Sequence, residues 1–271
     1  MSDAQTSFKA ALCQMESGAN PDANLAAAGS AIDVAAAGGA QLVCLPELWL
    51  CMDANVHTKL AAAEQPGEGP AQRLLASKAG EHRIHIVGGS IPLHSDESGK
   101  VFNSCLVYGP DGKLLNRYDK IHLFSFAGAD RDYDEALVCT AGSQPAAVDT
   151  DLGRIGLSIC YDLRFPELYR ALNQPDLITA PAAFTEPTGA AHWESLLRAR
   201  AIENQCFVLA AAQCGTHGGG LRTWGHSMAI SPWGDILTSA DREPGVFFAT
   251  IDHSLSAACR KKLPALQGRR L

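Results

Sequence analysis

Apolar and polar positions along the chain change between a helical period and a strand period. Residues 21–37 have a helical pattern, with Pro21 near the start and Gly38-Gly39 at the end, and predict a helix. The short apolar run 41–45 ends at Pro46 and predicts a strand buried on both faces. The same patterns predict a second helix around 70–81 and a second strand over 84–91.

A predicted hairpin closes each half of the chain. In the first half, residues 103–108 and 113–117 flank the turn Gly109-Pro110-Asp111-Gly112. The second half repeats this order, with predicted strands, helices and hairpin arms at 155–159, 166–172, 177–180, 191–205, 206–212, 226–231 and 235–239. Two helix and strand series that each end in a Pro-x-Gly hairpin indicate two related halves.

These elements predict an α/β fold in which helices lie outside two packed sheets. The hairpins require antiparallel pairing, and no G-x-G-x-x-G follows the first strand, so a single Rossmann sheet fits the order less well. No linker, charge block or low-complexity stretch divides the chain. We therefore expect one domain over residues 1–271, with an internal pseudo-twofold.

Composition and charge exclude several classes of protein. With 271 residues, of which 46% are apolar, the chain can form a large core and is neither disordered nor a small disulfide scaffold. A formal net charge of -7 argues against binding to nucleic acid. Five basic residues gather near the end, in a tail of about 253–271, which we interpret as solvated or docked on an acidic neighbour.

The cysteines and the apolar runs bear on the cell compartment. No apolar run approaches the ~18 residues that a membrane helix needs, and no positively charged leader precedes an apolar core at the start. The sequence therefore predicts a cytoplasmic protein that does not bind membranes. Nine scattered cysteines without a C-x-x-C pair indicate neither a disulfide framework nor a zinc site, so most should be core residues.

Cys160 is the first candidate for chemistry. It lies at the end of the apolar strand GRIGLSIC, directly before a turn that leads into a helix. Open α/β proteins place reactive groups at such strand ends, where backbone N–H groups favour a thiolate or an oxyanion. The alternative is that Cys160 is one more buried core cysteine.

A reactive thiol needs a base and a group that stabilises an oxyanion. None of the nine histidines has a decisive context, and His82 and His85 should point to opposite faces of one strand, which makes a metal pair unfavourable. Glu47, at the end of the first buried strand, is either a functional carboxylate or a surface acid. Lys120, after a hairpin strand, is either a functional ammonium or a solvated lysine.

Three segments together resemble a known family. LPELWL around Glu47, RYDKIHLF around Lys120 and GLSICYDLRFPELYR around Cys160 resemble the signature segments of the nitrilase superfamily, the carbon-nitrogen hydrolases, in order and approximate spacing. The resemblance covers nearly the whole chain and continues into AHWESLLRARAIENQCFVLAAAQCG and GHSMAISPWGDIL. These segments are similar to the branch that contains deaminated glutathione amidases and omega-amidases.

The resemblance implies an αββα sandwich and a Glu-Lys-Cys triad of Glu47, Lys120 and Cys160. Glu135, 25 residues before Cys160, falls where the family often has a second glutamate, although the preceding FSFAGADRDYD departs most from the family's wording. A Cys160 thioester would form and be hydrolysed, with Glu47 as the proton shuttle. Lys120 and the N–H of Tyr161 would stabilise the oxyanion. No metal or organic cofactor is needed.

The residues after the expected nucleophile bear on the substrate. True nitrilases typically have Cys-Trp-Glu, whereas this chain has Cys160-Tyr161-Asp162, which disfavours nitrile hydrolysis. Arg164 could bind a substrate carboxylate bidentately, or form a salt bridge with Asp162 or Glu167.

Two further residues bear on the acyl pocket. By resemblance, Phe184 and Thr188 would line it, although Phe184 could equally be a core residue. We expect a small-molecule substrate, a 2-oxo acid with a terminal amide. Deaminated glutathione is favoured over 2-oxoglutaramate, because segments such as RFPEL look closer to that group.

Two other hypotheses belong to different classes. A Cys-His acyl hydrolase would use a histidine beside Cys160 in place of Glu47. A binding protein would keep the fold and bind a small acid without turnover. The helices after Cys160 and after Phe184, with the basic tail, resemble regions through which the family forms homodimers, so we expect a homo-oligomer.

Overall fold

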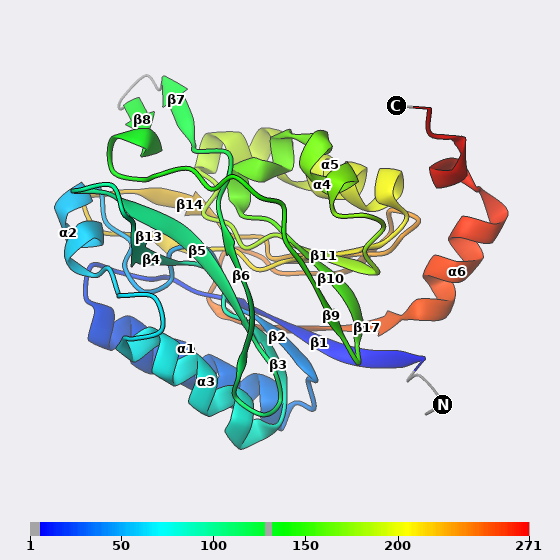
Figure 1. Cartoon of the computed structure of the whole chain (residues 1–271), viewed down its shortest axis with the longest axis horizontal. Helices are drawn as coiled ribbons and strands as arrows, with labels where there is room; N and C mark the ends of the chain where they lie inside the picture. Colours follow the sequence, from blue (N-terminus) through cyan, green and yellow to red (C-terminus); the bar gives the residue numbers. More distant parts are fainter. Residues whose placement is uncertain (1–5, 128–131, 271) are drawn as a thin grey trace.

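Two mixed sheets lie face to face between two layers of helices in the computed structural model, which describes residues 6–127 and 132–270 (Figure 1). The first sheet has the order β17-β1-β2-β3-β5-β4. Strands β3 and β4 pair with one edge of β5, and β6 pairs with the opposite edge. Its strands are β1 (Ser7–Gln14), β2 (Leu42–Cys44), β3 (His85–Val87), β4 (Ile91–His94), β5 (Val101–Tyr108), β6 (Leu114–Asp119) and β17 (Gly245–Asp252).

The second sheet has the order β16-β15-β12-β11-β10-β9. Its strands are β9 (Ala147–Thr150), β10 (Gly153–Leu157), β11 (Leu177–Thr179), β12 (Phe207–Ala210), β15 (Met228–Ile230) and β16 (Ile236–Ser239). In each sheet three parallel strands stand beside one antiparallel edge strand on one side and antiparallel hairpin strands on the other. This repeated connection order confirms the two related halves.

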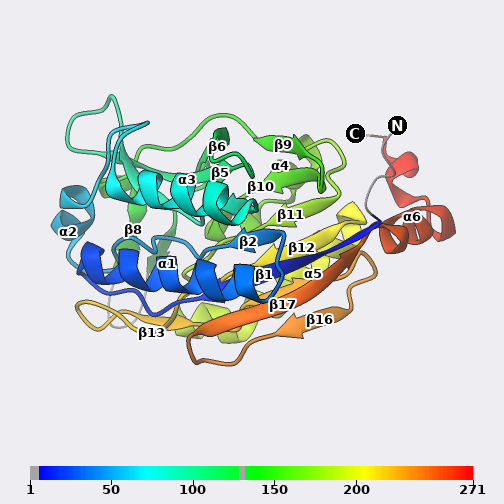
Figure 2. The ribbon, with the colours of Figure 1, turned by 90° about the horizontal axis from the view of Figure 1, so that it is seen from below.

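Helices cover the outer face of each sheet. The chain passes through α1 (Pro21–Ala37) and α3 (Pro70–His82) between the parallel strands of the first sheet, and through α4 (Pro166–Ala171) and α5 (Glu186–Asn204) in the second. Figure 2 shows α1 and α3 side by side over the first sheet. The layers predicted from the sequence are therefore confirmed.

The central strands are apolar on both faces because each faces two cores. In β1, Ala10 and Leu12 belong to a core that includes residues of both sheets, whereas Ala11 and Cys13 pack against α1 and α3. Burial of apolar area at ~25 cal/mol per Å² makes these two interfaces the main source of stability.

Smaller elements surround one end of the sandwich. They are α2 (Val56–Ala61), β7 (Ser125–Ala127), β8 (Asp132–Asp134), the 3-10 helices η1 (Glu135–Leu137) and η2 (Cys160–Arg164), β13 (Cys214–Thr216) and β14 (Arg222–Trp224). No helix in the described part of the chain is long and apolar enough to span a membrane.

The sequence predicted one strand over residues 84–91, and this prediction is wrong in one respect, because the structure has two separate strands there. Both β3 and β4 pair with the same edge of β5, but Gly88 and Gly89 interrupt them. Gly89 has φ +60°, and a Cβ there would lie 2.0 Å from the carbonyl oxygen of Pro46. The break therefore lets the backbone after β3 approach the turn after β2 closely.

Two other sequence predictions need correction. His82 is the last residue of α3 and lies 2.6 Å from Asp33, whereas His85 in β3 lies 3.2 Å from Asp151, so the two histidines do not share a strand. Helix α5 begins at Glu186, five residues before the predicted start, because Pro187 is compatible with the first turn of a helix.

The basic tail forms α6 (His253–Lys262) and η3 (Ala265–Gly268). Asp252 caps α6 by accepting from the Ser254 N–H at 2.9 Å. The Arg260 guanidinium donates to the carbonyl oxygen of Pro175 at 3.0 Å and lies 3.9 Å from Asp176. The docked alternative therefore describes the start of the tail better than the solvated one.

Candidate active site

Glu47 is held in a tight turn at the carboxyl end of β2. The next residue, Leu48, has φ +53°, a region that costs energy for a branched side chain, and its N–H donates to Ser90 Oγ at 3.0 Å. The Trp49 indole N–H donates to the carbonyl oxygen of Gly88 at 2.7 Å. These contacts fix a carboxylate that is only 3% exposed, which excludes the surface-acid alternative.

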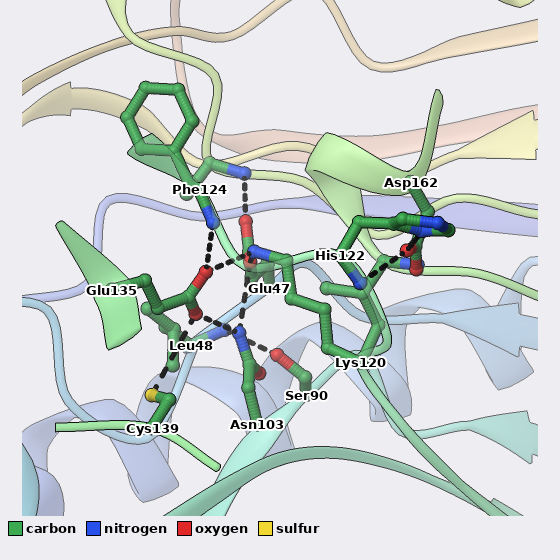
Figure 3. Close-up of polar contacts among 12 residues, drawn as sticks. Glu47, Leu48, Ser90, Asn103, Lys120, His122, Phe124, Glu135, Cys139 and Asp162 are labelled. Atoms are coloured by element: carbon green, nitrogen blue, oxygen red, sulfur yellow. Dashed lines mark hydrogen bonds and ion pairs between the residues drawn. The ribbon is translucent and has the colours of Figure 1, made fainter. Parts of the chain in front are cut away.

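Lys120 follows β6 and points into the same buried space. Its Nζ lies 2.8 Å from Glu47 Oε1 and 2.7 Å from Glu135 Oε2 (Figure 3). The Lys120 residue is 2% exposed, so it is not the solvated lysine of the alternative interpretation. An ammonium has three protons, and two acceptors leave one for a further partner.

Asn103, in the middle of β5, joins the two carboxylates. Its Nδ2 donates to Glu47 Oε1 and to Glu135 Oε1, both at 3.0 Å. Glu135, at the start of η1, also accepts from the Phe124 N–H at 2.9 Å. Figure 3 shows Lys120 and Asn103 between the two glutamates, an arrangement that compensates two buried negative charges.

Cys160 begins η2, and two residues separate it from the end of β10. It is 7% exposed and has φ +50°, an uncommon value for a residue other than glycine, and its N–H donates to the carbonyl oxygen of Pro181 at 2.9 Å. The thiol lines the same cavity as Glu47 and Lys120, and both charges act on it. Glu47 Oε2 accepts from the Ala183 N–H at 2.9 Å. The structure thus brings Glu47, Lys120, Glu135 and Cys160 together.

Asp162 holds the turn that carries the thiol. It has no exposed surface and accepts from the Ile159 N–H at 2.8 Å and from the Tyr118 hydroxyl at 2.7 Å. His122 Nδ1 lies 2.7 Å from the other carboxylate oxygen. Asp162 therefore fixes the backbone on the two sides of Cys160.

Burial and neighbouring charges shift the pKa values of the site. Burial, together with the charge of Glu47, raises the pKa of the Cys160 thiol well above its usual value, against the opposing effect of Lys120. Burial alone would lower the pKa of Lys120, but Glu135 and Glu47 raise it well above its usual value. At neutral pH the thiol is therefore protonated and the lysine charged.

Glu135 is ionised in this environment. Burial by itself would raise its pKa, but the charges of Lys120 and then Lys59 outweigh burial and lower the pKa to about 2. The arrangement can activate a thiol by transferring its proton to a carboxylate, and it holds an ammonium where negative charge would develop on a carbonyl oxygen.

No histidine lies beside the thiol among the described residues that line the cavity. The His122 ring pairs with Asp162 and stacks on Phe165 at 3.7 Å between ring centroids. The His192 ring faces Arg164. The Cys-His hypothesis is therefore not supported by this geometry.

A cavity of about 230 Å³ opens over the thiol. All four residues expected from the sequence to contact substrate line it, namely Tyr161, Arg164, Phe184 and Thr188. Arg164 does not pair with Asp162, whose oxygens are already occupied, and its guanidinium lies 3.3 Å from His192 Nδ1. The Arg164 guanidinium also stacks 5.6 Å from the ring centroid of Tyr161 and 5.5 Å from that of Phe184.

Phe184 and Thr188 line the cavity, and each contacts a neighbouring side chain. Phe184 packs against Trp193 at 4.9 Å between ring centroids, so it is both a core and a cavity residue. The Thr188 hydroxyl lies 2.7 Å from the Thr185 hydroxyl.

Sequence reasoning missed three groups of the site: Asn103, the N–H of Ala183, and Asp162 as the support of the thiol turn. A polar asparagine within the apolar strand VFNSC was the one available signal for Asn103. Residues 128–131 of the unusual segment before Glu135 lie outside the described residues. Within the described ranges, no group of three or more His, Cys, Asp or Glu side chains is arranged to hold a metal ion.

Known proteins resemble this chain over nearly its whole length. The chain is 42% identical to a deaminated glutathione amidase of Yersinia enterocolitica, over 96% of this chain and 92% of the relative. It is 37% identical to the human omega-amidase, over 98% of this chain and 96% of the relative.

A solved structure and a family match extend the comparison. The C. elegans NitFhit protein has a TM-score of 0.89 at 36% identity, and the match covers 98% of this chain and 66% of that longer chain. Residues 9–261 match the family described as carbon-nitrogen hydrolase. The chain therefore belongs to the carbon-nitrogen hydrolase family.

Proposed function

We propose that the protein is an amidase that hydrolyses a non-peptide amide through a thioester on Cys160. The observation that carries the proposal is the buried contact of one ammonium with two carboxylates, Lys120 with Glu47 and Glu135, in the cavity that holds the thiol. Such a cluster is costly to bury, and proteins keep perturbed groups of this kind mainly where chemistry requires them.

In the first half of the reaction, Glu47 accepts the thiol proton while sulfur attacks the amide carbon. The raised pKa of Cys160 means that this proton leaves during the attack and not before it. The carbonyl oxygen becomes negative and is stabilised by the free proton of Lys120 and by the N–H of Tyr161, each donor contributing ~3 kcal/mol. When the C–N bond breaks, Glu47 returns the proton to the departing amine.

In the second half, water replaces the amine. Glu47 takes a proton from the water, and the resulting hydroxide attacks the thioester carbon. The C–S bond then breaks, sulfur regains its proton, and the carboxylic acid leaves. Glu135 acts as a positioning residue, because it holds Lys120 and shares the Asn103 amide with Glu47. None of these steps requires a metal or an organic cofactor.

Deaminated glutathione is the proposed substrate, cleaved to 2-oxoglutarate and cysteinylglycine. Arg164 would bind the carboxylate of the 2-oxo acid beside Tyr161, while Phe184 and Thr188 would contact the acyl chain. The relative from Yersinia enterocolitica is named for this activity. The second candidate is an omega-amidase that acts on 2-oxoglutaramate or 2-oxosuccinamate, as the name of the human relative indicates.

A substrate panel separates these activities. We expect kcat/KM to be highest for 2-oxo amides that release cysteinylglycine, lower for those that release ammonia, and undetectable for nitriles and carbamoyl compounds. Activity confined to nitriles would overturn the substrate proposal, and highest activity with 2-oxoglutaramate would favour the omega-amidase.

Glu47→Gln separates the proposed mechanism from one based on histidine. We expect turnover to fall by about 10³-fold, since the proton shuttle is lost in both half-reactions. Near-normal turnover would favour a histidine base and remove Glu47 from the mechanism.

We also infer that the protein acts in the cytoplasm and forms homodimers, by analogy with the family. Light scattering of the purified chain tests the assembly. A mass of two or more chains is expected, and a mass of 28.7 kDa would contradict the inference.

A further inference from the structure

We propose that Lys59 binds a second carboxylate of the substrate, carried by the departing amine. The preferred substrates would then have a carboxylate on each side of the scissile C–N bond. This inference rests on the proposed amidase function, and it specifies the class of amide that the site accepts.

Lys59 lies on the outer wall of the cavity. It belongs to α2, a short helix without fully buried residues, at the same end of the molecule as β8 (Figure 1). Its side chain is half-buried and lines the same cavity as Glu47 and Cys160. A leaving group that extends from the thiol toward solvent would pass this wall.

Lys59 forms no ion pair with any residue that the structure describes, whereas the acids of the same cavity already have partners. Glu135, whose pKa Lys59 helps to lower, lies 2.7 Å from Lys120 Nζ. Asp53 accepts from the Asn55 N–H at 3.0 Å and from the Thr58 hydroxyl at 3.1 Å. Asp134 caps η1 by accepting from the Ala136 N–H at 3.0 Å. A half-buried ammonium in a cavity gains most from an anion that enters with the ligand.

The other cations of the cavity do not duplicate this position. Lys120 is occupied by two glutamates, and Arg222 lies 3.2 Å from Glu186. Arg164 stacks on Tyr161 and Phe184, on the wall formed by η2 and the segment before α5. Arg164 and Lys59 therefore offer two separate positive charges, on different elements, to one ligand.

The assignment of the two charges follows from their places. Arg164 is four residues from the thiol and contacts Phe184, the expected wall of the acyl pocket, so it takes the acyl carboxylate. Lys59, on helix α2, is therefore assigned to the carboxylate of the leaving group. An amide that releases ammonia can engage only the first of these two charges.

Two matched amides of 2-oxoglutarate test the proposal. One carries an N-carboxymethyl group and the other an uncharged N-propyl group of similar length. We expect the first to have a kcat/KM about tenfold higher in the unchanged protein, and Lys59→Met to remove most of that ratio. Lys59→Arg should keep the preference, and Lys113→Met, in the turn between β5 and β6, should leave it unchanged. Added salt should weaken it.

Either of two results would overturn the assignment: an unchanged ratio in Lys59→Met, or an equal loss with both amides. Binding tests the same point without turnover. In a Cys160→Ala protein, Lys59→Met should weaken calorimetric binding of the carboxymethyl amide about tenfold more than that of the propyl amide. Absence of hydrolysis of every amide would contradict the amidase proposal, whereas equal effects of Lys59→Met on binding of the two amides would contradict only the assignment to Lys59.

Discussion

The two halves of the molecule share a connection order but contribute different chemistry. Glu47 follows β2 and Ala183 follows β11, the middle parallel strand of each sheet. The first position supplies a carboxylate, and the second supplies a backbone N–H that donates to it at 2.9 Å. The repeat therefore brings equivalent strand ends together, and only the side chains make one end reactive.

The first parallel strand of each half shows the same contrast. Cys160 comes soon after β10, whereas the corresponding strand β1 ends at Gln14. The Gln14 amide donates to the carbonyl oxygens of Asp241 and Glu243, at 2.7 and 2.8 Å, and serves structure alone. Topology thus determines where a group can act, and the residue type determines whether it does.

The largest effect on turnover is expected from a substitution in the second half, at Cys160. We expect Cys160→Ala to lower amide turnover by about 10⁴-fold or more, since the thiol that carries the acyl group is lost. Steady-state kinetics with a 2-oxo amide measures this. Gln14→Ala, a change at the end of β1 in the first half, should lower the free energy of unfolding by about 2 kcal/mol and leave turnover nearly unchanged. Similar losses of turnover in both variants would contradict the division of chemistry.

In the first half, Lys120→Met should affect both stability and turnover. Two buried carboxylates would lose their cation, so we expect the free energy of unfolding to fall by about 3 kcal/mol and turnover by about 10³-fold. Urea unfolding and steady-state kinetics measure the two losses. The double variant Lys120→Met, Glu135→Gln should regain part of the stability and none of the turnover. Recovery of turnover would show that the ammonium serves only to balance charge.

Acid should destabilise the protein through Glu135. Its pKa is about 2 in the folded state, against 4.5 without the fold, so the unfolded chain binds more protons between these values. The contribution of Glu135 is complete above pH 4.5 and is lost as the pH falls toward 2, by about 3 kcal/mol at most. Urea unfolding from pH 6 to pH 3 measures the loss. Glu135→Gln should flatten this dependence, and an equally steep curve would place the titration elsewhere.

A smaller effect is expected from Asn103, which bridges the two carboxylates. Asn103→Ala removes two hydrogen bonds to charged groups, so the free energy of unfolding should fall by about 2 kcal/mol and kcat by about tenfold. Asn103→Asp should lower kcat further, because it places a third carboxylate at 3.0 Å from the other two. Equal activity of the aspartate variant and the unchanged protein would show that the amide does not tune the site.

The smallest effect should come from Arg164 at the cavity wall. Arg164→Leu should raise KM for a 2-oxo acid amide about tenfold and change kcat little, since a uniform binding contact is lost. Kinetics with an amide that lacks the 2-oxo acid carboxylate provides the control, because its KM should hardly change. A loss confined to kcat would place Arg164 with the reacting groups.

Much of this fold could be predicted from the sequence because its strands are short apolar runs with clear ends. The same pattern located Glu47 and Cys160, since reactive groups stand where such runs stop. The edge strands β9 and β17 and the first strand β1 were not predicted. β17 pairs with β1 over its whole length, across more than 230 residues, and no local pattern encodes that pairing.

The support of the site was harder to predict than its reactive groups. Asn103, the Ala183 N–H and Asp162 act through contacts between segments distant in sequence, such as Asp162 with Tyr118. A backbone N–H has no signature in the sequence at all. The pairing of Lys120 with Glu135 was expected only through the family resemblance, because the segment between them has no regular pattern.

The most direct measurement of the central claim is the mass of the peptide that contains the nucleophile. Trypsin releases residues 155–164, with Cys160 as the one cysteine. After acid quench during turnover of a 2-oxo amide, this peptide should gain the mass of the acyl group, and the same experiment on Glu47→Gln should give less of it. An unmodified peptide at full turnover, or an acyl group on another residue, would contradict the account.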